Sequence, residues 1–225
     1  MNKNKENNTI IKSKREKDTK ERIFKAAIDL FSEKGFDAAS MREIAEMVGI
    51  KKASLYSHYN SKDQILEKIL KYPIKRMGTV GQQDVNTEEL IVSLGLEKFM
   101  DLAGDLILSW MEDPYMEKIW RIICIELYHN PQIKKFYSEF ISLSCSYWES
   151  AFDLMIKHKL IKPIDPRLLA SEYLSFYGNS YMEYFILHYD GSSASYLDEY
   201  KNRIEKHSKF IINSIKQNEE IKLGD

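Results

Sequence analysis

The stretch "SMREIAEMVGIKKASLYSHYNSKDQIL", residues 40–66, contains two helix-start signals and one tight turn between them. Ser40 is followed three residues later by a glutamate, and Ser61 is followed three residues later by a glutamine, which makes each serine the first residue of a capping box. Gly49 suits the left-handed position that ends a helix. Two short helices joined by such a turn form a helix-turn-helix.

A longer helix precedes this motif and is predicted from Asp18 or Thr19 to Gly35. Its apolar residues recur at helical spacing and form one face: Ile23, Ala26, Ala27, Leu30 and Phe31. The helix that follows Ser61 should kink or end at Pro73, because proline lacks the backbone donor and disfavours helical geometry in the residue before it.

The rest of the chain is also predicted to be helical, because its 9 glycines and 5 prolines are few among 225 residues and leave long periodic runs between them. Residues 1–17 are polar and lysine-rich and are expected to form a flexible basic tail, and residues 78–86 a linker. Further helices are expected at about 87–111, 114–128, 131–159, 166–189 and 195–217. The fold class is therefore all-α.

Charge is distributed unevenly along the chain. Residues 1–76 hold 18 Lys and Arg against 11 Asp and Glu, a net charge of +7, whereas the remaining residues hold 15 against 23, a net charge of −8. A basic N-terminal part on an acidic body is typical of a protein that binds a polyanion at one end. Chance clustering of surface lysines is the alternative explanation of the charge alone.

The segment 22–66 resembles the DNA-binding domain of the tetracycline-repressor (TetR) family. The matching positions lie at the family's spacing over about 45 residues and include Ala26-Ala27, Leu30-Phe31, Gly35, Ser40, Ile44-Ala45, Gly49, Leu55-Tyr56, His58-Tyr59 and Lys62-Asp63. The resemblance covers the first third of the chain. It implies a helix-turn-helix DNA-binding domain at 18–76 and a helical effector-binding and dimerisation domain at 77–225.

The resemblance also assigns roles to residues of this chain. The helix from about Lys51 to Tyr59 would enter the major groove, where lysine can donate to guanine. The implied DNA contacts, to bases or to phosphates, are Ser40, Arg42, Lys51, Lys52, Ser54, Tyr56, Ser57, His58 and Lys62. Tyr59 is expected in the core rather than at the DNA.

Aromatic residues are concentrated in the C-terminal body. The helix at 166–189 is apolar nearly all round, so both of its sides must be covered, and a second subunit is one way to cover the outer side. With the family's dimer as a guide, the expected interface is Tyr173, Tyr184, Tyr196, Tyr200, Ile204, His207 and Ile211. By family analogy an effector pocket would be lined by Trp110, Tyr128, Phe136, Phe140, Tyr147, Trp148, Phe152, Tyr177 and Tyr181, although plain core packing is the better explanation of each residue taken alone. Glu126 and Glu183 near apolar faces suggest a cationic effector or a nearby lysine as their partner.

The sequence offers no signature of an enzyme, since it contains no nucleophile elbow, phosphate loop or dinucleotide fingerprint and no pair of histidines at metal-binding spacing. We expect no metal and no cofactor. Cys124 and Cys145 fit buried thiols. The expected protein is a cytoplasmic homodimer, most simply a repressor, that binds a palindromic double-stranded DNA operator and is released by a small-molecule effector. The alternative is a DNA-binding protein whose acidic body docks a protein partner instead of a small ligand.

Overall fold

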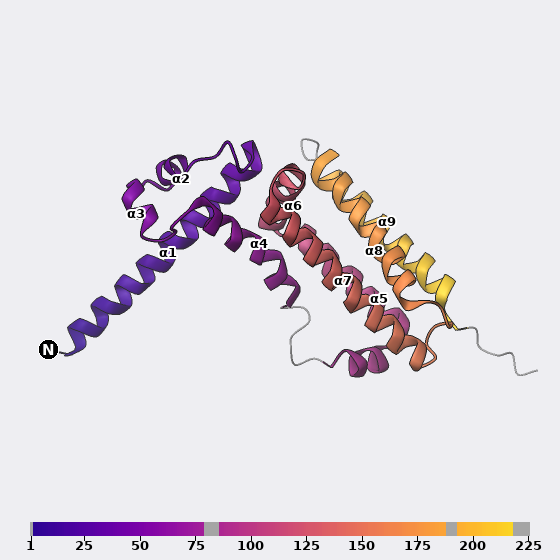
Figure 1. The fold of residues 1–225 in the computed structure, drawn as a ribbon. Helices are drawn as coiled ribbons and strands as arrows, with labels where there is room; N and C mark the ends of the chain where they lie inside the picture. Colours follow the sequence, from indigo (N-terminus) through magenta and orange to yellow (C-terminus); the bar gives the residue numbers. More distant parts are fainter. Residues whose placement is uncertain (1, 79–85, 188–192, 218–225) are drawn as a thin grey trace, which may run out of the picture. The chain divides into compact units, whose positions relative to one another are not determined.

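A computed structural model describes residues 2–78, 86–187 and 193–217 of the chain and is helical throughout (Figure 1). Its elements are α1 (Asn2–Lys34), α2 (Met41–Val48), α3 (Lys52–Tyr56), α4 (Lys62–Gly78), α5 (Thr87–Met111), α6 (Pro114–Glu126), α7 (Pro131–Lys157), α8 (Pro166–Met182), the π-helix η1 (Glu183–Leu187) and α9 (Ser193–Ile215). Within these ranges the extended structure is limited to one isolated bridge between Ile161 and Lys216. The prediction of an all-α fold is confirmed, as are the positions of the five C-terminal helices.

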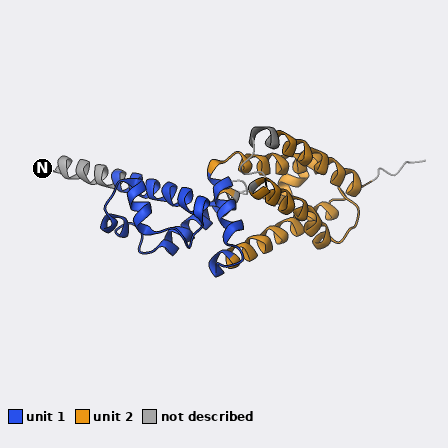
Figure 2. Cartoon of the chain, turned by 90° about the horizontal axis from the view of Figure 1, so that it is seen from above, with its two compact units in different colours: residues 1–75, 115–133 blue, residues 76–114, 134–225 orange. Residues whose placement is uncertain are grey.

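The chain divides into two compact units (Figure 2). Unit 1 comprises Met1–Lys75 and Tyr115–Ile133, and unit 2 comprises Arg76–Pro114 and Lys134–Asp225. This division differs from a single cut near residue 77, because α6 belongs to the unit that holds the helix-turn-helix.

Polar contacts between α6 and α1 explain this membership. Lys118 Nζ lies 2.6 Å from Asp29 Oδ1, and Arg121 Nε donates to the Ser32 carbonyl at 3.0 Å. These contacts tie α6 to α1 within unit 1.

The core of unit 1 is built from the apolar faces that the sequence predicts. On α1 the predicted face is buried, and α2 and α3 add Ile44, Val48 and Leu55. The apolar positions of α4, which are Ile65, Leu66, Ile69 and Leu70, complete this core.

The structure differs from one prediction about a helix start and narrows a second prediction about a helix end. The first helix begins at Asn2, so residues 2–17 extend α1 and do not form the expected flexible tail. No glycine or proline interrupts these residues, and lysine and glutamate are good helix formers. The fourth helix continues through Pro73 to Gly78, so of the two expected effects of this proline, a kink or an end, the end does not occur. The linker expected at 78–86 lies, except for its two end residues, outside the described residues.

Unit 2 contains the antiparallel pair α5 and α9, tied by an ion pair at each end. Lys201 Nζ lies 2.9 Å from Glu112 Oε1, and Lys216 Nζ lies 2.7 Å from Glu97 Oε1. Aromatic rings join α7 to α8, with the Trp148 and Tyr173 centroids 4.3 Å apart. Along the described part of the chain, no helix has the length and apolar character that a membrane crossing requires.

Candidate nucleic-acid interface

The turn between α2 and α3 is fixed by backbone hydrogen bonds. Gly49 has a φ of 72° and a ψ of 34°, and the amides of Gly49 and Ile50 donate back to carbonyls in the last turn of α2. Glycine adopts the left-handed backbone conformation without steric cost, so the helix can end at this residue. Arg22 on α1 donates to the Val48 carbonyl and so ties the end of α2 to the first helix.

The short helix α3 has one buried and one exposed side. Leu55 is fully buried and anchors α3 to the core of unit 1. On the other side a set of polar and basic side chains is exposed, consisting of Lys51, Lys52, Ser54, Tyr56 and Ser57. This is the orientation that a recognition helix needs, since the buried side fixes its position and the exposed side is free to meet a groove.

Within this exposed set the structure shows few competing interactions. Ser57 Oγ donates to the Ser54 carbonyl at 2.7 Å, and Lys52 Nζ lies 5.8 Å from the centre of the Tyr56 ring. Tyr56 is 41% exposed, and His58 is half-buried, with its Nδ1 covered and lacking a hydrogen-bond partner among the described residues. Contacts of these residues with DNA stay a prediction.

Tyr59 occupies the core, as predicted. It is buried, and its hydroxyl accepts from Lys68 Nζ at 2.9 Å.

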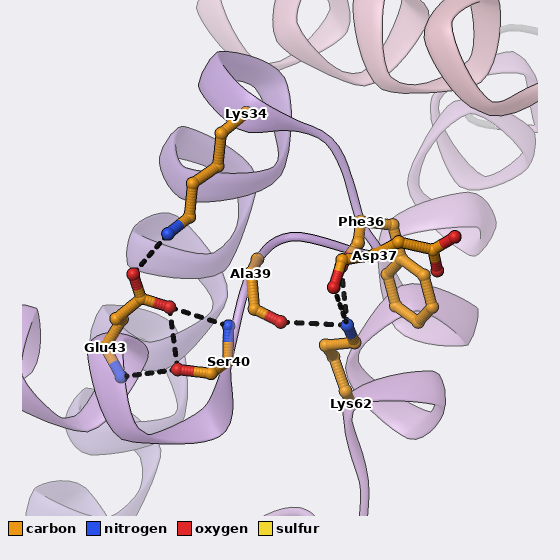
Figure 3. A network of polar contacts seen from close by, with 7 residues as sticks. All are labelled: Lys34, Phe36, Asp37, Ala39, Ser40, Glu43 and Lys62. Atoms are coloured by element: carbon orange, nitrogen blue, oxygen red, sulfur yellow. Dashed lines mark hydrogen bonds and ion pairs between the residues drawn. The ribbon is translucent and has the colours of Figure 1, made fainter.

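The start of α2 carries the predicted capping box (Figure 3). Glu43 N donates to Ser40 Oγ at 3.3 Å, and Ser40 N donates to Glu43 Oε2 at 2.9 Å. An ion pair with Lys34, together with the Ser40 hydroxyl, lowers the pKa of Glu43 to about 2. Ser40 is exposed, and Arg42 is exposed beside Glu46, with Nε and Oε1 2.8 Å apart. Both side chains are accessible on the surface of unit 1, although each already has a partner.

Lys62 has a different place from the one that the family resemblance implies. Its Nζ donates to the carbonyls of Phe36, Asp37 and Ala39 at 2.5, 3.3 and 2.8 Å, and it lies 4.2 Å from the centre of the Phe36 ring (Figure 3). An ammonium group has three donors, and all three are used inside the protein. The structure therefore assigns Lys62 to holding the connection between α1 and α2, and we correct its assignment as a DNA contact.

The same connection is held by Glu126 at the end of α6. This carboxylate is buried, at 6% exposure, and its Oε1 accepts from the Phe36 amide at 2.6 Å. Gly35 makes this approach possible, since a Cβ there would lie 2.8 Å from Glu126 Oε1. The partner of Glu126 is thus a backbone amide of unit 1, and not a cationic effector. Residues 90 positions apart give no local signal in the sequence, so the sequence could not predict this contact.

The residues predicted to line an effector pocket do not form one group. Trp148, Phe152 and Tyr177 are buried in unit 2 around Tyr173. Tyr128 is 82% exposed and belongs to unit 1, so it is removed from the set.

The remaining members of that set have varied environments. Phe136 is buried and pairs with Phe140, with ring centroids 6.0 Å apart. Tyr147 is exposed, whereas Trp110 and Tyr181 are half-buried with their polar atoms covered.

The predicted dimer contacts need correction. Most of them are buried within a single subunit, namely Tyr173, Tyr184, Tyr200, Ile204 and Ile211, while His207 is half-buried and stacks on Phe176 with ring centroids 3.8 Å apart. The side chain of Tyr196 lies outside the described residues. A side chain already buried in its own subunit has no surface left to give to a partner, and helical spacing cannot distinguish the two kinds of burial.

Other chemistry is not indicated in the part of the chain that the structure describes. No three His, Cys, Asp or Glu side chains there are grouped so that they could hold a metal ion. Cys124 and Cys145 are half-buried thiols outside any disulfide of the described residues, and burial raises the pKa of Cys124 to about 11.

Unit 1 thus contains a helix-turn-helix whose second helix, α3, has one side anchored in the core and one side exposed. This is the arrangement of helix-turn-helix DNA-binding domains. Comparison with known proteins gives the family of this domain: residues 23–69 match the family described as "Bacterial regulatory proteins, tetR family". This segment is therefore a TetR-family DNA-binding domain. Regulators of this family bind DNA and are not enzymes, which agrees with the prediction from sequence.

Among curated relatives, the biofilm operon icaADBC HTH-type negative transcriptional regulator IcaR of Staphylococcus aureus (strain Newman) is 52% identical over 52 residues. The match spans 23% of this chain and 28% of that protein, so it concerns the DNA-binding domain alone.

Solved structures extend the likeness over most of the chain. A TetR-family transcriptional regulator from Mesorhizobium loti has a TM-score of 0.64 at 23% identity, covering 90% of this chain and 98% of that one. Salmonella enterica GusR has a TM-score of 0.63 at 19% identity, covering 87% and 95%. The chain thus has the fold of a TetR-family regulator, with a helical C-terminal part.

Proposed function

We propose that this protein is a dimeric transcriptional repressor that binds a palindromic DNA operator through α2 and α3 and is released when unit 2 binds a small molecule. The observation that carries the proposal is the exposed basic and hydroxyl-bearing side of α3, opposite the buried Leu55, in a domain of the TetR family. The name of the relative IcaR, a negative regulator, supports repression rather than activation. Its place of action is the cytoplasm, where the DNA is.

The proposed DNA contacts fall into two groups. Lys51, Lys52 and Ser54 lie at the N-terminal part of α3 and would reach base edges or phosphates. Tyr56, Ser57 and His58 would donate to phosphates, as would Ser40 and Arg42 at the start of α2, and so fix the register on the duplex.

The proposed dimer interface moves to the apolar side chains that one subunit leaves exposed on its last helices. These are Leu168, Met182, Ile186, Leu187 and Phe210. Exposed apolar side chains of this size, gathered on α8, η1 and α9, mark an interaction surface. A two-fold dimer would present two copies of α3 to two half-sites about one helical turn, roughly 34 Å, apart.

Release by an effector follows from differential binding. A ligand that prefers a conformation in which the two recognition helices no longer match the half-sites lowers operator occupancy. The interior of unit 2, where aromatic side chains pack between α5, α7, α8 and α9, is the part of the chain that we assign to effector control.

In vitro selection of duplexes from a random pool tests DNA binding directly. A palindromic consensus bound by the wild type, and weakened at least tenfold by Lys52→Ala or Tyr56→Ala, would support the proposal. Wild-type affinity in both variants, or binding that does not depend on salt concentration, would refute it. A thermal-shift screen with small molecules separates effector control from docking of a protein partner to the acidic body, since a saturable rise in Tm requires a ligand.

A further inference from the structure

The interior of unit 2 holds polar atoms whose hydrogen-bonding capacity is unused. Ser180 on α8 is fully buried, and its Oγ finds no hydrogen-bond partner among the described residues. The same is true of the covered Nε1 atom of Trp110 on α5. A buried donor without a partner is costly, so native proteins keep few of them, and each calls for an explanation.

The contacts between α5 and α9 show which residues of α9 lie beside Trp110 along the helix axis. Glu112 pairs with Lys201, and a Cβ built on Gly104 would lie 3.6 Å from Ile204 Cγ2. Trp110 comes between Gly104 and Glu112 on α5 and therefore lies at the level of residues 201–204 of α9.

The packing of α8 against α9 places Ser180 at the same level. The Tyr177 ring lies 5.7 Å from that of His207, and the Tyr184 ring lies 6.0 Å from that of Tyr200, each measured between centroids. Ser180 falls between these two contacts and so faces α9 between residues 200 and 207. Trp110 and Ser180 thus lie at the same level along the three helices.

The formal charges next to this layer are paired within the protein. Asp113, whose side chain is 9% exposed, has its Oδ2 3.1 Å from Arg76 Nε. Among the described residues, the one charged residue that is buried as a whole is Glu126, which belongs to unit 1. Glu183, next to the layer, already pairs with Arg203 at 2.5 Å, and both side chains remain about one-third exposed. Burial lowers the pKa of His207 and raises the pKa of Tyr181, which favours the uncharged form of each side chain.

The backbone next to Ser180 is also unusual. Helix α8 passes directly into the π-helix η1 at Glu183, three residues after Ser180. A π-helix is rare in proteins.

We propose that unit 2 binds an uncharged molecule with an aromatic body and a hydrogen-bond acceptor oxygen, at the layer of Trp110 and Ser180 between α5, α8 and α9. The indole N–H can only donate, and the serine hydroxyl can donate as well, so the ligand must supply an acceptor. A charged ligand would lose its hydration without meeting an unpaired opposite charge, which is strongly unfavourable. The inference rests on the proposed function in one respect, namely that this ligand is the effector.

Matched compounds test the chemistry without DNA. One-, two- and three-ring aromatic scaffolds, each carrying a methyl ketone, a primary amine or a carboxylate, are titrated into the full-length protein by calorimetry. We expect at least one ketone to bind at least tenfold more tightly than the amine and the carboxylate of the same scaffold. Ser180→Ala should weaken that ketone about fivefold, the usual effect of one hydrogen bond, and Trp110→Phe should do the same.

Ser171→Ala is the matched control, because Ser171 lies on the exposed side of the same helix. It should leave the affinity for the ketone unchanged. Tighter binding of an amine or a carboxylate, binding of none of the ketones, or an equal effect of Ser180→Ala and Ser171→Ala would overturn the inference. Because these titrations contain no DNA, a protein that bound the ketone but not DNA would refute the proposed function alone.

Discussion

Replacing Lys62 and Lys52 in turn by methionine separates a lysine that holds the fold from a lysine that faces DNA. Methionine keeps most of the straight apolar stem and removes the charge. In Lys62→Met the carbonyls of Phe36, Asp37 and Ala39 lose the ammonium that reaches them at 2.5, 3.3 and 2.8 Å.

The expected loss of stability follows from these hydrogen bonds. A hydrogen bond to a charged group contributes about 1.5–3 kcal/mol net, and the three bonds here share one partly exposed ammonium. We therefore expect Lys62→Met to lower the free energy of unfolding by about 2–3 kcal/mol. Lys52 is exposed, and its Nζ lies 5.8 Å from the centre of the Tyr56 ring, so Lys52→Met should change stability by less than about 0.5 kcal/mol.

Two assays read out the two roles. Urea denaturation followed by circular dichroism gives the change in stability. Fluorescence anisotropy with the selected duplex at several salt concentrations gives the slope of log K against log salt, whose magnitude falls by about 0.9 for each phosphate that the protein no longer neutralises. Lys52→Met should reduce that slope in magnitude, and Lys62→Met should leave it unchanged at temperatures where the protein is folded.

The opposite pattern would refute the reasoning. If Lys62→Met kept wild-type stability and lowered the salt slope as Lys52→Met does, the Lys62 ammonium would be a phosphate contact, and its bonds to the three carbonyls would not describe the protein in solution.

Three further predictions concern a glycine, a capping residue and an exposed aromatic. In urea denaturation, Gly35→Ala should destabilise the protein by about 2 kcal/mol more than Gly49→Ala. Both glycines have a positive φ, but only a Cβ at Gly35 would meet Glu126 Oε1. Equal losses of stability in the two variants would contradict this. Glu43→Gln should destabilise the protein at pH 6, where Glu43 is ionised in both the folded and the unfolded state and its low pKa in the folded state contributes fully to stability. The difference in unfolding free energy from wild type should shrink between pH 4.5 and 2, as the carboxylate is protonated. A difference that does not change with pH, measured by denaturation at several pH values, would argue against the ion pair. Phe210→Asp should raise the dimer dissociation constant at least tenfold in analytical ultracentrifugation, because this ring is 67% exposed in one subunit and the dimer would bury the new carboxylate. An unchanged constant would remove Phe210 from the interface.

Much of unit 1 could be predicted from local patterns. The capping box at Ser40, the turn at Gly49 and the buried anchor Leu55 each depend on a few neighbouring residues, and the structure confirms all three. The exposure of Lys51 and Lys52 follows from the same periodicity, because the position of Leu55 fixes which side of α3 faces inward.

The residues of unit 2 were harder to assign because periodicity shows that a side chain is covered but not what covers it. Tyr173, Tyr200 and Ile204 lie on apolar stripes, and a partner subunit and the subunit's own core produce the same stripe. The exposed Phe210, by contrast, has no distinctive position in the sequence.

The sequence by itself determined the elements of this protein: where most of its helices begin and end, that two of them form a helix-turn-helix, and which side of the short helix after Gly49 is polar. These features depend on capping, turn and periodicity effects that act within a few residues. Only the tertiary structure decided that Lys62 holds carbonyls instead of facing solvent, and that α6 joins the DNA-binding unit through Glu126. It also decided that Tyr173, Tyr177 and Tyr200 are interior. The reason is that each of these contacts joins residues that are distant in the sequence. A side chain could make the same interaction with several other groups, and only the fold determines which of them lies next to it.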